Sequence, residues 1–310
     1  MTGVGVPTAP ATPAPGAAEA PALAVEHVCA GYGPYRALFD VGFTVPAGAV
    51  VALLGSNGAG KSTVARTVTG LVPCTSGTVS VAGRDVTGLP AYKIARAGVA
   101  HVPEGRGIFA SLTVEENLVL TFRQRGGRQS VAGSLARAYE AFPVLGERRK
   151  QRGGTLSGGQ QRLLSLAKVL VVPPQLLVAD ELSLGLAPVV VDAVYDGLRE
   201  INRAGTALLV VEQQVDRVLS LAQEAVVLEH GAVAFAGPSS EAMAAVEQVL
   251  AARGEQTMLV ERDAAGAEAG NAPDGGDGHR TRRWRHGRGR QGKNADTGGQ
   301  DGGTRGEEAP

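Results

Sequence analysis

The stretch AVVALLGSNGAGKST, residues 49–63, joins an apolar run to a glycine-rich loop. The run at 49–54 contains no polar residue, which is typical of a parallel strand that is buried on both faces. The loop at 55–63 matches the pattern G-x-x-x-x-G-K-[ST], and the segment TVARTVTGL that begins at its last residue has the pattern of a helix. Strand, loop and helix in this order predict a site where backbone amides and a helix N-terminus bind phosphate oxygens.

The residue types in this loop indicate which groups they bind. We expect Lys61 to reach the β- and γ-phosphates of a nucleotide such as ATP, and the Ser62 hydroxyl to coordinate Mg²⁺. The rest of the loop would bind phosphate through amides and hydroxyls, and its residues are Gly55, Ser56, Asn57, Gly58, Ala59, Gly60 and Thr63. The alternative is a glycine-rich turn that matches the pattern by chance.

A second segment, PPQLLVADELSLGLAP at 173–188, raises a question about buried charge. Its apolar run at 175–179 predicts another buried strand, and Asp180 and Glu181 stand side by side at the end of that strand. Adjacent carboxylates repel each other and lose hydration there, unless a cation offsets their charge. We therefore expect Asp180 to hold Mg²⁺ and Glu181 to accept a proton from the attacking water. The alternative is a strand end whose acids are solvated.

A third segment, TLSGGQQRLLSLAKVL at 155–170, predicts a helix that begins at a second anion site. Apolar residues recur at helical spacing through its second half, which favours a buried face. The first residues would offer bare amides and one hydroxyl to an anion. These residues are Ser157, Gly158, Gly159 and Gln160. Taken alone, the segment is also compatible with an ordinary glycine-rich helix start.

Together, GSNGAGKST, LSGGQ and LLVADE resemble the ATP-binding cassette (ABC) ATPases, over the whole of residues 23–252. The resemblance implies that two cassettes pair head to tail, with ATP between the glycine-rich loop of one and the LSGGQ of the other. Ser157 and Gly159 would then contact a γ-phosphate held by the partner chain. Tyr32, in AGYG, matches the family's aromatic residue that stacks on adenine. The alternative for Tyr32 is a tyrosine of the core.

Two positions depart from the usual ABC pattern. Glu104, in HVPEGRGIF, stands where the loop that couples ATP to the membrane subunits usually has Gln. It can still bind Mg²⁺ or water through oxygen, but it adds negative charge. Gln213, in VVEQQ, stands where His is usual. It can still donate a hydrogen bond to a γ-phosphate, but it cannot become cationic.

These replacements, with TVEENL and LSLGLAP, resemble an ATPase subunit of branched-chain amino-acid ABC importers. Relatives that import urea or amides usually keep Gln at the first position, so Glu104 favours amino acids. Leu182 stands where the family usually has Pro after the catalytic Glu, and Ala179 replaces a bulkier aliphatic residue. Without Pro, the turn that must hold Glu181 has more freedom, and we expect a working but less rigid site.

Strand-like segments, among them LAVEHV at 23–28, TALLVV at 206–211 and EAVVLEH at 224–230, alternate with helix-like segments and predict an α/β fold. In the helix-like segment at 189–202, one face would carry Val191, Val194, Leu198 and Ile201. The resemblance implies a P-loop ATPase core with a mostly parallel sheet and an antiparallel N-terminal β part. Helical patterns without a strand predict a helical insertion at about 112–172. Residues 1–22 and 253–310 lack core-forming residues, and we expect both to be disordered.

The resemblance implies transmembrane permease subunits and a second ABC ATPase as partners, in a homodimer or heterodimer. An external solute-binding protein would act indirectly. The resemblance implies a peripheral position at the cytoplasmic face of the plasma membrane. In agreement with this, we find no secretory signal and no run of about eighteen apolar residues, so we do not expect the chain to span a membrane by itself. The two cysteines, Cys29 and Cys74, fit no metal spacing and favour a reduced compartment. A bare cassette that serves an exporter is an alternative.

A soluble ABC ATPase that acts on nucleic acid or ribosomes is the remaining alternative. The stretch HRTRRWRHGRGRQGK, 279–293, carries seven Arg or Lys, with Trp284 among them. It could contact phosphates and stack on a base, or lie on an anionic membrane, but we favour a solvated tail. Net charge is near zero, and the chain holds a single P-loop and a single LSGGQ, whereas ribosome-acting cassette proteins usually hold two cassettes. Nucleic acid is therefore disfavoured as a partner.

Overall fold

The computed structural model describes residues 20–104, 107–125, 131–249 and 251. Within them, the strands are β1 (Leu23–Tyr32), β2 (Tyr35–Val45), β3 (Val50–Gly55), β4 (Cys74–Val81), β5 (Arg84–Asp85), β6 (Val99–Val102), β7 (Leu176–Asp180), β8 (Ala207–Val211), β9 (Glu224–Glu229) and β10 (Ala232–Pro238). The helices are α1 (Lys61–Val68), α2 (Ala91–Arg96), α3 (Val114–Arg125), α4 (Val131–Ala141), α5 (Pro143–Glu147), the 3₁₀ helix η1 (Gly153–Thr155), α6 (Gly158–Val171), α7 (Pro188–Arg203) and α8 (Val215–Leu219).

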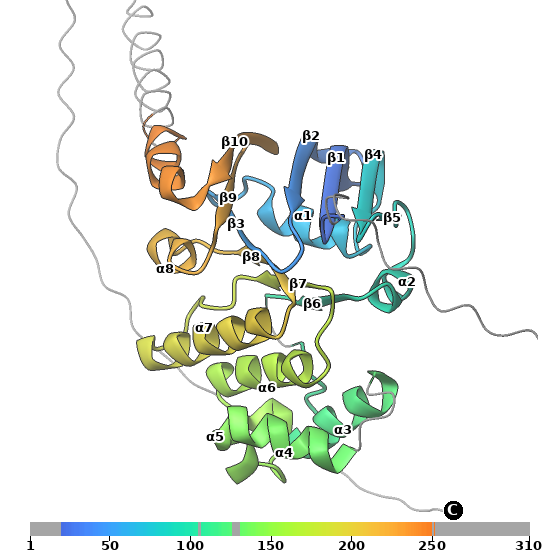
Figure 1. Cartoon of the computed structure of the whole chain (residues 1–310), viewed down its shortest axis with the longest axis vertical. Helices are drawn as coiled ribbons and strands as arrows, with labels where there is room; N and C mark the ends of the chain where they lie inside the picture. Colours follow the sequence, from blue (N-terminus) through green and yellow to red (C-terminus); the bar gives the residue numbers. More distant parts are fainter. Residues whose placement is uncertain (1–19, 105–106, 126–130, 250, 252–310) are drawn as a thin grey trace, which may run out of the picture. The chain divides into compact units, whose positions relative to one another are not determined.

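The larger sheet has the strand order β10-β9-β3-β8-β7-β6, and only β10 runs antiparallel to its neighbour (Figure 1). Every residue of β7 and β8 is buried, as are the first five of β3, which explains their continuous apolar sequences. The expected mostly parallel core is therefore confirmed. Because β3, β8, β7 and β6 are parallel, their carboxyl ends meet at one edge of the sheet.

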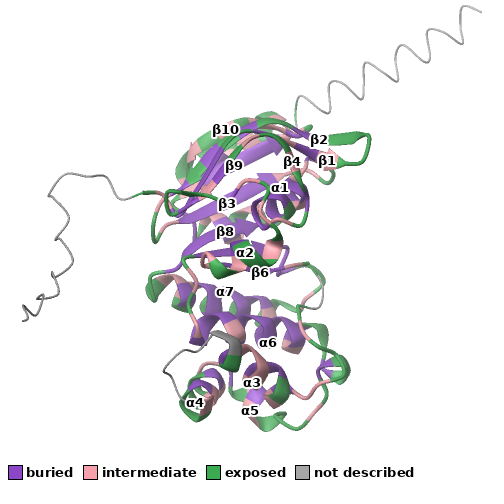
Figure 2. Cartoon of the chain, turned by 90° about the vertical axis from the view of Figure 1, so that its right-hand side faces the viewer, coloured by how far each residue is buried: buried purple, intermediate pink, exposed green. Residues whose placement is uncertain are grey.

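Successive residues of β3 face two different hydrophobic cores, because side chains alternate along a strand. Val51 and Leu53 pack in a core with α1 and the antiparallel sheet. Val50, Ala52 and Leu54 pack in a core with α6 and α7. The sheet thus separates two layers, with its strands buried between them (Figure 2).

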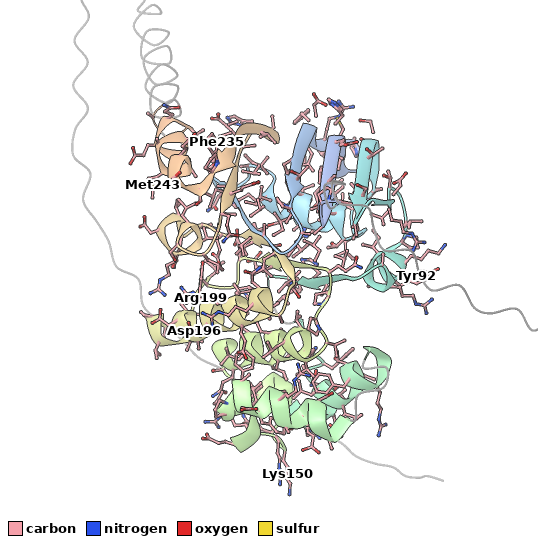
Figure 3. The ribbon with its side chains drawn as sticks, in the orientation of Figure 1. Tyr92, Lys150, Asp196, Arg199, Phe235 and Met243 are labelled. Atoms are coloured by element: carbon pink, nitrogen blue, oxygen red, sulfur yellow. The ribbon has the colours of Figure 1, made fainter. Side chains whose placement is uncertain are left out.

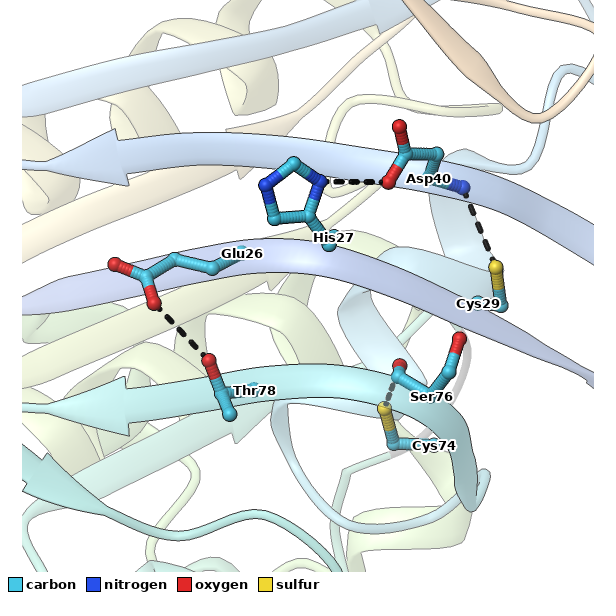
Figure 4. A network of polar contacts seen from close by, with 7 residues as sticks. All are labelled: Glu26, His27, Cys29, Asp40, Cys74, Ser76 and Thr78. Atoms are coloured by element: carbon cyan, nitrogen blue, oxygen red, sulfur yellow. Dashed lines mark hydrogen bonds and ion pairs between the residues drawn. The ribbon is translucent and has the colours of Figure 1, made fainter.

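A smaller antiparallel sheet of order β2-β1-β4-β5 covers the α1 side, as expected for the N-terminal β part. Its outer surface carries polar cross-strand contacts between β1, β2 and β4 (Figure 4). Nδ1 of His27 lies 2.8 Å from Oδ1 of Asp40, and both residues have a positive φ at irregularities in the β1–β2 register. Cys29 and Cys74 are free thiols on neighbouring strands.

The segment that the sequence assigns to a helical insertion contains α3, α4, α5, η1 and α6. These helices pack together on the face of the sheet opposite α1, where α6 also contacts α7 and β6 (Figure 1). The predicted apolar face of α7 is buried at Val191, Val194, Leu198 and Ile201. Its outer face carries the ion pair of Arg199 and Asp196, at 2.8 Å (Figure 3).

Several elements have no counterpart in the sequence analysis: β2, β4, β5, α2, β6 and β10. The short β6, with four residues, forms the edge of the parallel sheet next to β7. The expected disordered ends, and the basic stretch at 279–293, lie outside the described residues except for residues 20–22. There, Ala22 is buried and its carbonyl accepts a hydrogen bond from Ala82 at 3.2 Å.

Candidate functional site

The glycine-rich loop joins β3 to α1, as the sequence predicts. Gly55 has a φ of 145°, and a Cβ there would lie 2.4 Å from the carbonyl oxygen of Leu228 on β9. Gly60 precedes α1 with a φ of 106°, and its Cβ would lie 2.9 Å from Leu38. Both positions therefore require glycine, because any side chain would meet strain as well as a neighbouring atom.

Lys61 is buried at the start of α1, and its ammonium lies back over the loop. Nζ donates hydrogen bonds to the carbonyl oxygens of Gly55, at 2.9 Å, and Ser56, at 3.1 Å. Burial lowers the pKa of Lys61, and the nearby carboxylates of Glu181 and Asp180 oppose that shift. A cation held in this way is ready to exchange carbonyl oxygens for the phosphate oxygens of a nucleotide.

Asp180 ends β7 directly opposite the loop and is only 1% exposed. Its Oδ1 accepts a hydrogen bond from Oγ of Ser62 at 3.4 Å, so the structure brings together the two residues expected to hold Mg²⁺. Burial, followed by the negative charges of Glu181 and Glu104, raises the pKa of Asp180 to about 6. A buried carboxylate under this repulsion suits a divalent cation.

The described residues contain no group of three or more His, Cys, Asp or Glu side chains placed to hold a metal by themselves. Mg²⁺ prefers oxygen ligands and usually shares them with phosphates and water. The hydroxyl of Ser62 and the carboxylate of Asp180 fit that demand, with phosphate oxygens as the other ligands.

Glu181 follows Asp180 in a left-handed turn with a φ of 48°. Its amide donates to the carbonyl of Val211 at 2.9 Å, and its carbonyl accepts from Nη2 of Arg162 at 3.3 Å. Its Oε1 accepts a hydrogen bond from Nε2 of Gln213 at 2.9 Å. Since left-handed residues other than glycine are strained, these contacts hold Glu181 where its backbone would not otherwise stay.

Glu212 and Ser183 hold this turn in place through buried hydrogen bonds. Neither residue was predicted from the sequence. Glu212 is 2% exposed and accepts hydrogen bonds from the amide, at 3.0 Å, and the hydroxyl, at 2.7 Å, of Ser183. Burial raises the pKa of Glu212. Its place in VVEQQ, directly after a buried apolar strand, was the sequence signal that could have revealed it.

Glu104 follows β6 on the same edge of the sheet and is exposed. Its charge acts on Asp180, so the structure brings it towards the expected Mg²⁺ site. Arg162, on α6, donates from Nη1 to the carbonyl of Pro103 at 2.8 Å, which ties the residue before Glu104 to the helix. Arg162 was not predicted from the sequence, because its contacts join segments far apart in the chain.

Tyr32 lies at the end of β1 and is 44% exposed, so it is not a tyrosine of the core. Its hydroxyl accepts a hydrogen bond from Nη1 of Arg66, on α1, at 3.2 Å. This contact holds the ring near the helix that follows the glycine-rich loop. The ring is therefore available to stack on a base whose phosphates lie in the loop.

The LSGGQ segment opens α6 through a capping box. Oγ of Ser157 accepts from the amide of Gln160 at 3.3 Å, and the side chain of Gln160 accepts from the amide of Ser157 at 3.1 Å. Among the described residues, no hydrogen bond connects this helix start to the glycine-rich loop of the same chain. A Cβ at Gly159 would lie 2.4 Å from Val190, so glycine lets α6 approach α7 closely.

Residues 38–183 match the family model of the ABC transporter. The chain is 40% identical over 215 residues to BraG, a high-affinity branched-chain amino acid transport ATP-binding protein of Pseudomonas aeruginosa. That alignment covers 68% of this chain and 90% of BraG. The chain belongs to the ABC transporter ATP-binding subunits. It is also 35% identical over 213 residues to a probable LivF of Archaeoglobus fulgidus, covering 68% and 90% of the two chains.

Among solved structures, an ATP-binding subunit of an ABC transporter superposes with a TM-score of 0.63 and 28% identity. The match covers 70% of this chain and 89% of that one. As a member of this family, the chain is an ATP-hydrolysing subunit that powers transport through membrane partners, and it is peripheral to the membrane. None of its described helices combines the length and apolar character that a membrane span requires.

Proposed function

We propose that the chain hydrolyses ATP to drive an importer of branched-chain amino acids. The relatives named for this transport, BraG and LivF, support the proposal, as do Glu104 and Gln213 at the positions where that branch departs from other ABC ATPases. The observation that carries the catalytic part is the contact of Gln213 with Glu181. It holds a carboxylate beside the buried pair of Asp180 and Ser62.

In the proposed nucleotide site, Tyr32 stacks on adenine while residues 55–63 bind the phosphates through amides and hydroxyls. Lys61 leaves the carbonyl oxygens of Gly55 and Ser56 for the β- and γ-phosphates. Ser62 and Asp180 would hold Mg²⁺, and Glu104 would offer a further oxygen ligand from the edge of the site. The bound cation offsets the negative charge of the phosphates and of Asp180.

Glu181 acts as the general base in this proposal. Its carboxylate accepts the proton of the attacking water, and the amide of Gln213 keeps that carboxylate oriented. Because Gln213 is neutral, it orients Glu181 without competing for the proton. Ser157, Gly158, Gly159 and Gln160 bind the γ-phosphate of ATP held by a partner cassette, which places each site between two subunits.

Two transmembrane permeases and a second ABC ATPase are the proposed partners, with an external binding protein that delivers the solute to the permeases. The cytoplasmic face of the plasma membrane is the proposed location, because ATP is available there. Closure of the cassette dimer on ATP would move the permeases, and hydrolysis would reopen the dimer.

The test is to extract the tagged chain gently from its native membranes, identify what co-purifies, and reconstitute that complex in vesicles. We expect two permeases and a second cassette, and ATP-dependent uptake of labelled leucine, isoleucine or valine. Uptake of urea or short amides in place of these amino acids would show that branched-chain amino acids are not the transported solute. Co-purification of ribosomal proteins or nucleic acid without a permease would overturn the importer itself.

A further inference from the structure

Arg162 lies where three parts of the site meet. It belongs to α6, the helix that begins after Ser157, and it is 7% exposed. Nη1 donates to the carbonyl of Pro103 at 2.8 Å, and Nη2 donates to the carbonyl of Glu181 at 3.3 Å. One guanidinium therefore connects the start of α6, the loop that carries Glu104, and the turn that carries Glu181.

The charges around Arg162 explain why a buried cation is tolerated there. Burial lowers the pKa of Arg162, and the carboxylates of Glu104, Glu212, Asp180 and Glu181 act in the opposite direction. Glu104 is the strongest of the four. A guanidinium remains charged even when it is buried, and its planar fork can reach two acceptors at once. Lys61, the other buried cation of the site, would be occupied by phosphates once ATP binds.

The turn at Glu181 needs such a contact more than an ordinary turn does. Its φ of 48° is disfavoured for a residue with a side chain, and Leu182 follows it without the fixed ring of a proline. The amide of Glu181 is held by Val211, whereas its carbonyl is held by Arg162. Without the second contact, the strained φ of Glu181 would be free to relax by rotation about its N–Cα bond, and this rotation would turn the carboxylate.

We propose that Arg162 is a positioning residue for ATP hydrolysis, which aims the Glu181 carboxylate by holding its carbonyl and couples it to the Glu104 loop and to α6. Arg162 acts on the reaction through Glu181. A displacement of the helix that begins at Ser157, when that helix meets the ATP of a partner cassette, is transmitted through Arg162 to this chain's own Glu181. The inference rests on Glu181 as the proposed general base.

The experiment compares Arg162→Gln and Arg162→Lys in the complete complex that co-purifies with the full-length chain. Arg162→Gln removes the charge and the fork, and we expect kcat to fall about 100-fold, while KM for ATP changes less than about threefold. Arg162→Lys keeps the charge but cannot span both carbonyls, so we expect a loss of about 10-fold. If Arg162 had a purely structural role, Arg162→Gln would lower the melting temperature without a large fall in kcat at a nearly unchanged KM.

The matched control is Gln161→Leu. Gln161 is the neighbouring buried residue of α6, and its Nε2 donates to the carbonyls of Gly153, at 3.2 Å, and Leu156, at 3.1 Å. Its loss removes buried hydrogen bonds from the same helix without touching Pro103 or Glu181. We expect a comparable fall in melting temperature and a kcat within about threefold of the wild type.

Equal kcat values for Arg162→Gln and Gln161→Leu would overturn the proposal. If Arg162→Gln fails to fold, a folded Arg162→Lys with wild-type kcat overturns it in the same way. Glu181→Gln, assayed alongside, separates the two ideas. If Glu181→Gln still hydrolyses ATP, Glu181 is not the base. If Glu181→Gln is inactive while Arg162→Lys is fully active, Glu181 remains the base and only the role of Arg162 is rejected.

Discussion

Nε2 of Gln213 donates a hydrogen bond of 2.9 Å to Oε1 of Glu181, across the carboxyl ends of two neighbouring parallel strands. This contact joins the residue expected to replace a histidine with the residue expected to act as base. A neutral amide can orient a carboxylate at any pH at which the protein is folded, whereas an imidazole would titrate. The site therefore depends on geometry at this position and not on a protonation state.

Replacement of Glu181 by Gln should abolish turnover and preserve ATP binding. The amide keeps the shape of the side chain but cannot accept the proton of the attacking water, so we expect at least about a 100-fold loss of kcat. Steady-state hydrolysis measures the loss, and binding of labelled ATP measures the affinity. The variant should also trap the closed dimer, and normal turnover would exclude Glu181 as the base.

Replacement of Gln213 by Ala should lower kcat by about 10-fold or more and leave KM for ATP nearly unchanged, because the Glu181 carboxylate loses its orienting donor. Gln213→His provides the second measurement. The wild-type pH–rate profile should lack a contribution from this position, whereas the profile of the histidine variant should gain a transition at about pH 6.5. Identical profiles for the two proteins would contradict this account.

The sequence alone suggests that Pro would stiffen the turn at Glu181, but the structure buries Leu182 in the core, so its replacement by Pro should lower both stability and turnover. Leu182 is 1% exposed in the core that contains α6 and α7, and its truncation to a proline ring leaves a cavity that costs about 2–4 kcal/mol. A proline also disfavours the φ of 48° at the residue before it. Urea denaturation and ATP hydrolysis measure the two effects.

Leu182→Met is the matched control, because it keeps volume and should cost less than about 1.5 kcal/mol. If Leu182→Pro left both stability and turnover unchanged, the turn would not depend on the side chain that follows Glu181.

Replacement of Asp180 by Asn should stabilise the protein in the absence of Mg²⁺ and nucleotide. The folded pKa of about 6 exceeds the ordinary value of 3.8, so the folded state binds the proton more tightly than the unfolded state. The wild type therefore loses stability as pH rises from about 4 through 6, by about 2–3 kcal/mol, and Asn avoids this loss. Urea denaturation in EDTA at pH 5 and pH 8 measures the difference.

The gain from Asp180→Asn should be largest at pH 8 and about half as large at pH 5, which lies between the two pKa values. Asp196→Asn, at an exposed ion pair, should change stability little at either pH. Mg²⁺ with ATP should stabilise the wild type more than Asp180→Asn. A variant that is destabilised at pH 8 without Mg²⁺ would show that Asp180 is not strained by its surroundings.

Replacement of Tyr32 by Ala should raise KM for ATP by about 10-fold and leave kcat unchanged, because stacking on the base contributes to binding and not to the chemical step. Tyr32→Phe keeps the ring and removes only the contact with Arg66, so its KM should remain near the wild-type value. A larger effect of Phe than of Ala would assign the role to the hydroxyl.

The sequence by itself determined the elements whose signals are local. The glycine-rich loop between an apolar strand and a helix, the apolar runs of β7 and β8, and the helix that begins after Ser157 are each encoded within a few neighbouring residues. Backbone conformation and burial periodicity depend on such short segments, so these predictions were correct. The strands β2, β4 and β10 escaped prediction because their half-exposed patterns gain stability only from pairing.

Only the tertiary structure decided which distant residues share the site. The sheet order β3-β8-β7-β6 places the ends of four parallel strands side by side, although they lie far apart in the chain. It thereby brings Gln213 to Glu181, and Ser62 to Asp180. The buried hydrogen bonds of Arg162 have no local signature, because their acceptors are backbone carbonyls on other elements. The local sequence determines which helix, strand or loop each segment can form. The strand order determines which charged side chains and backbone carbonyls come close enough to form hydrogen bonds.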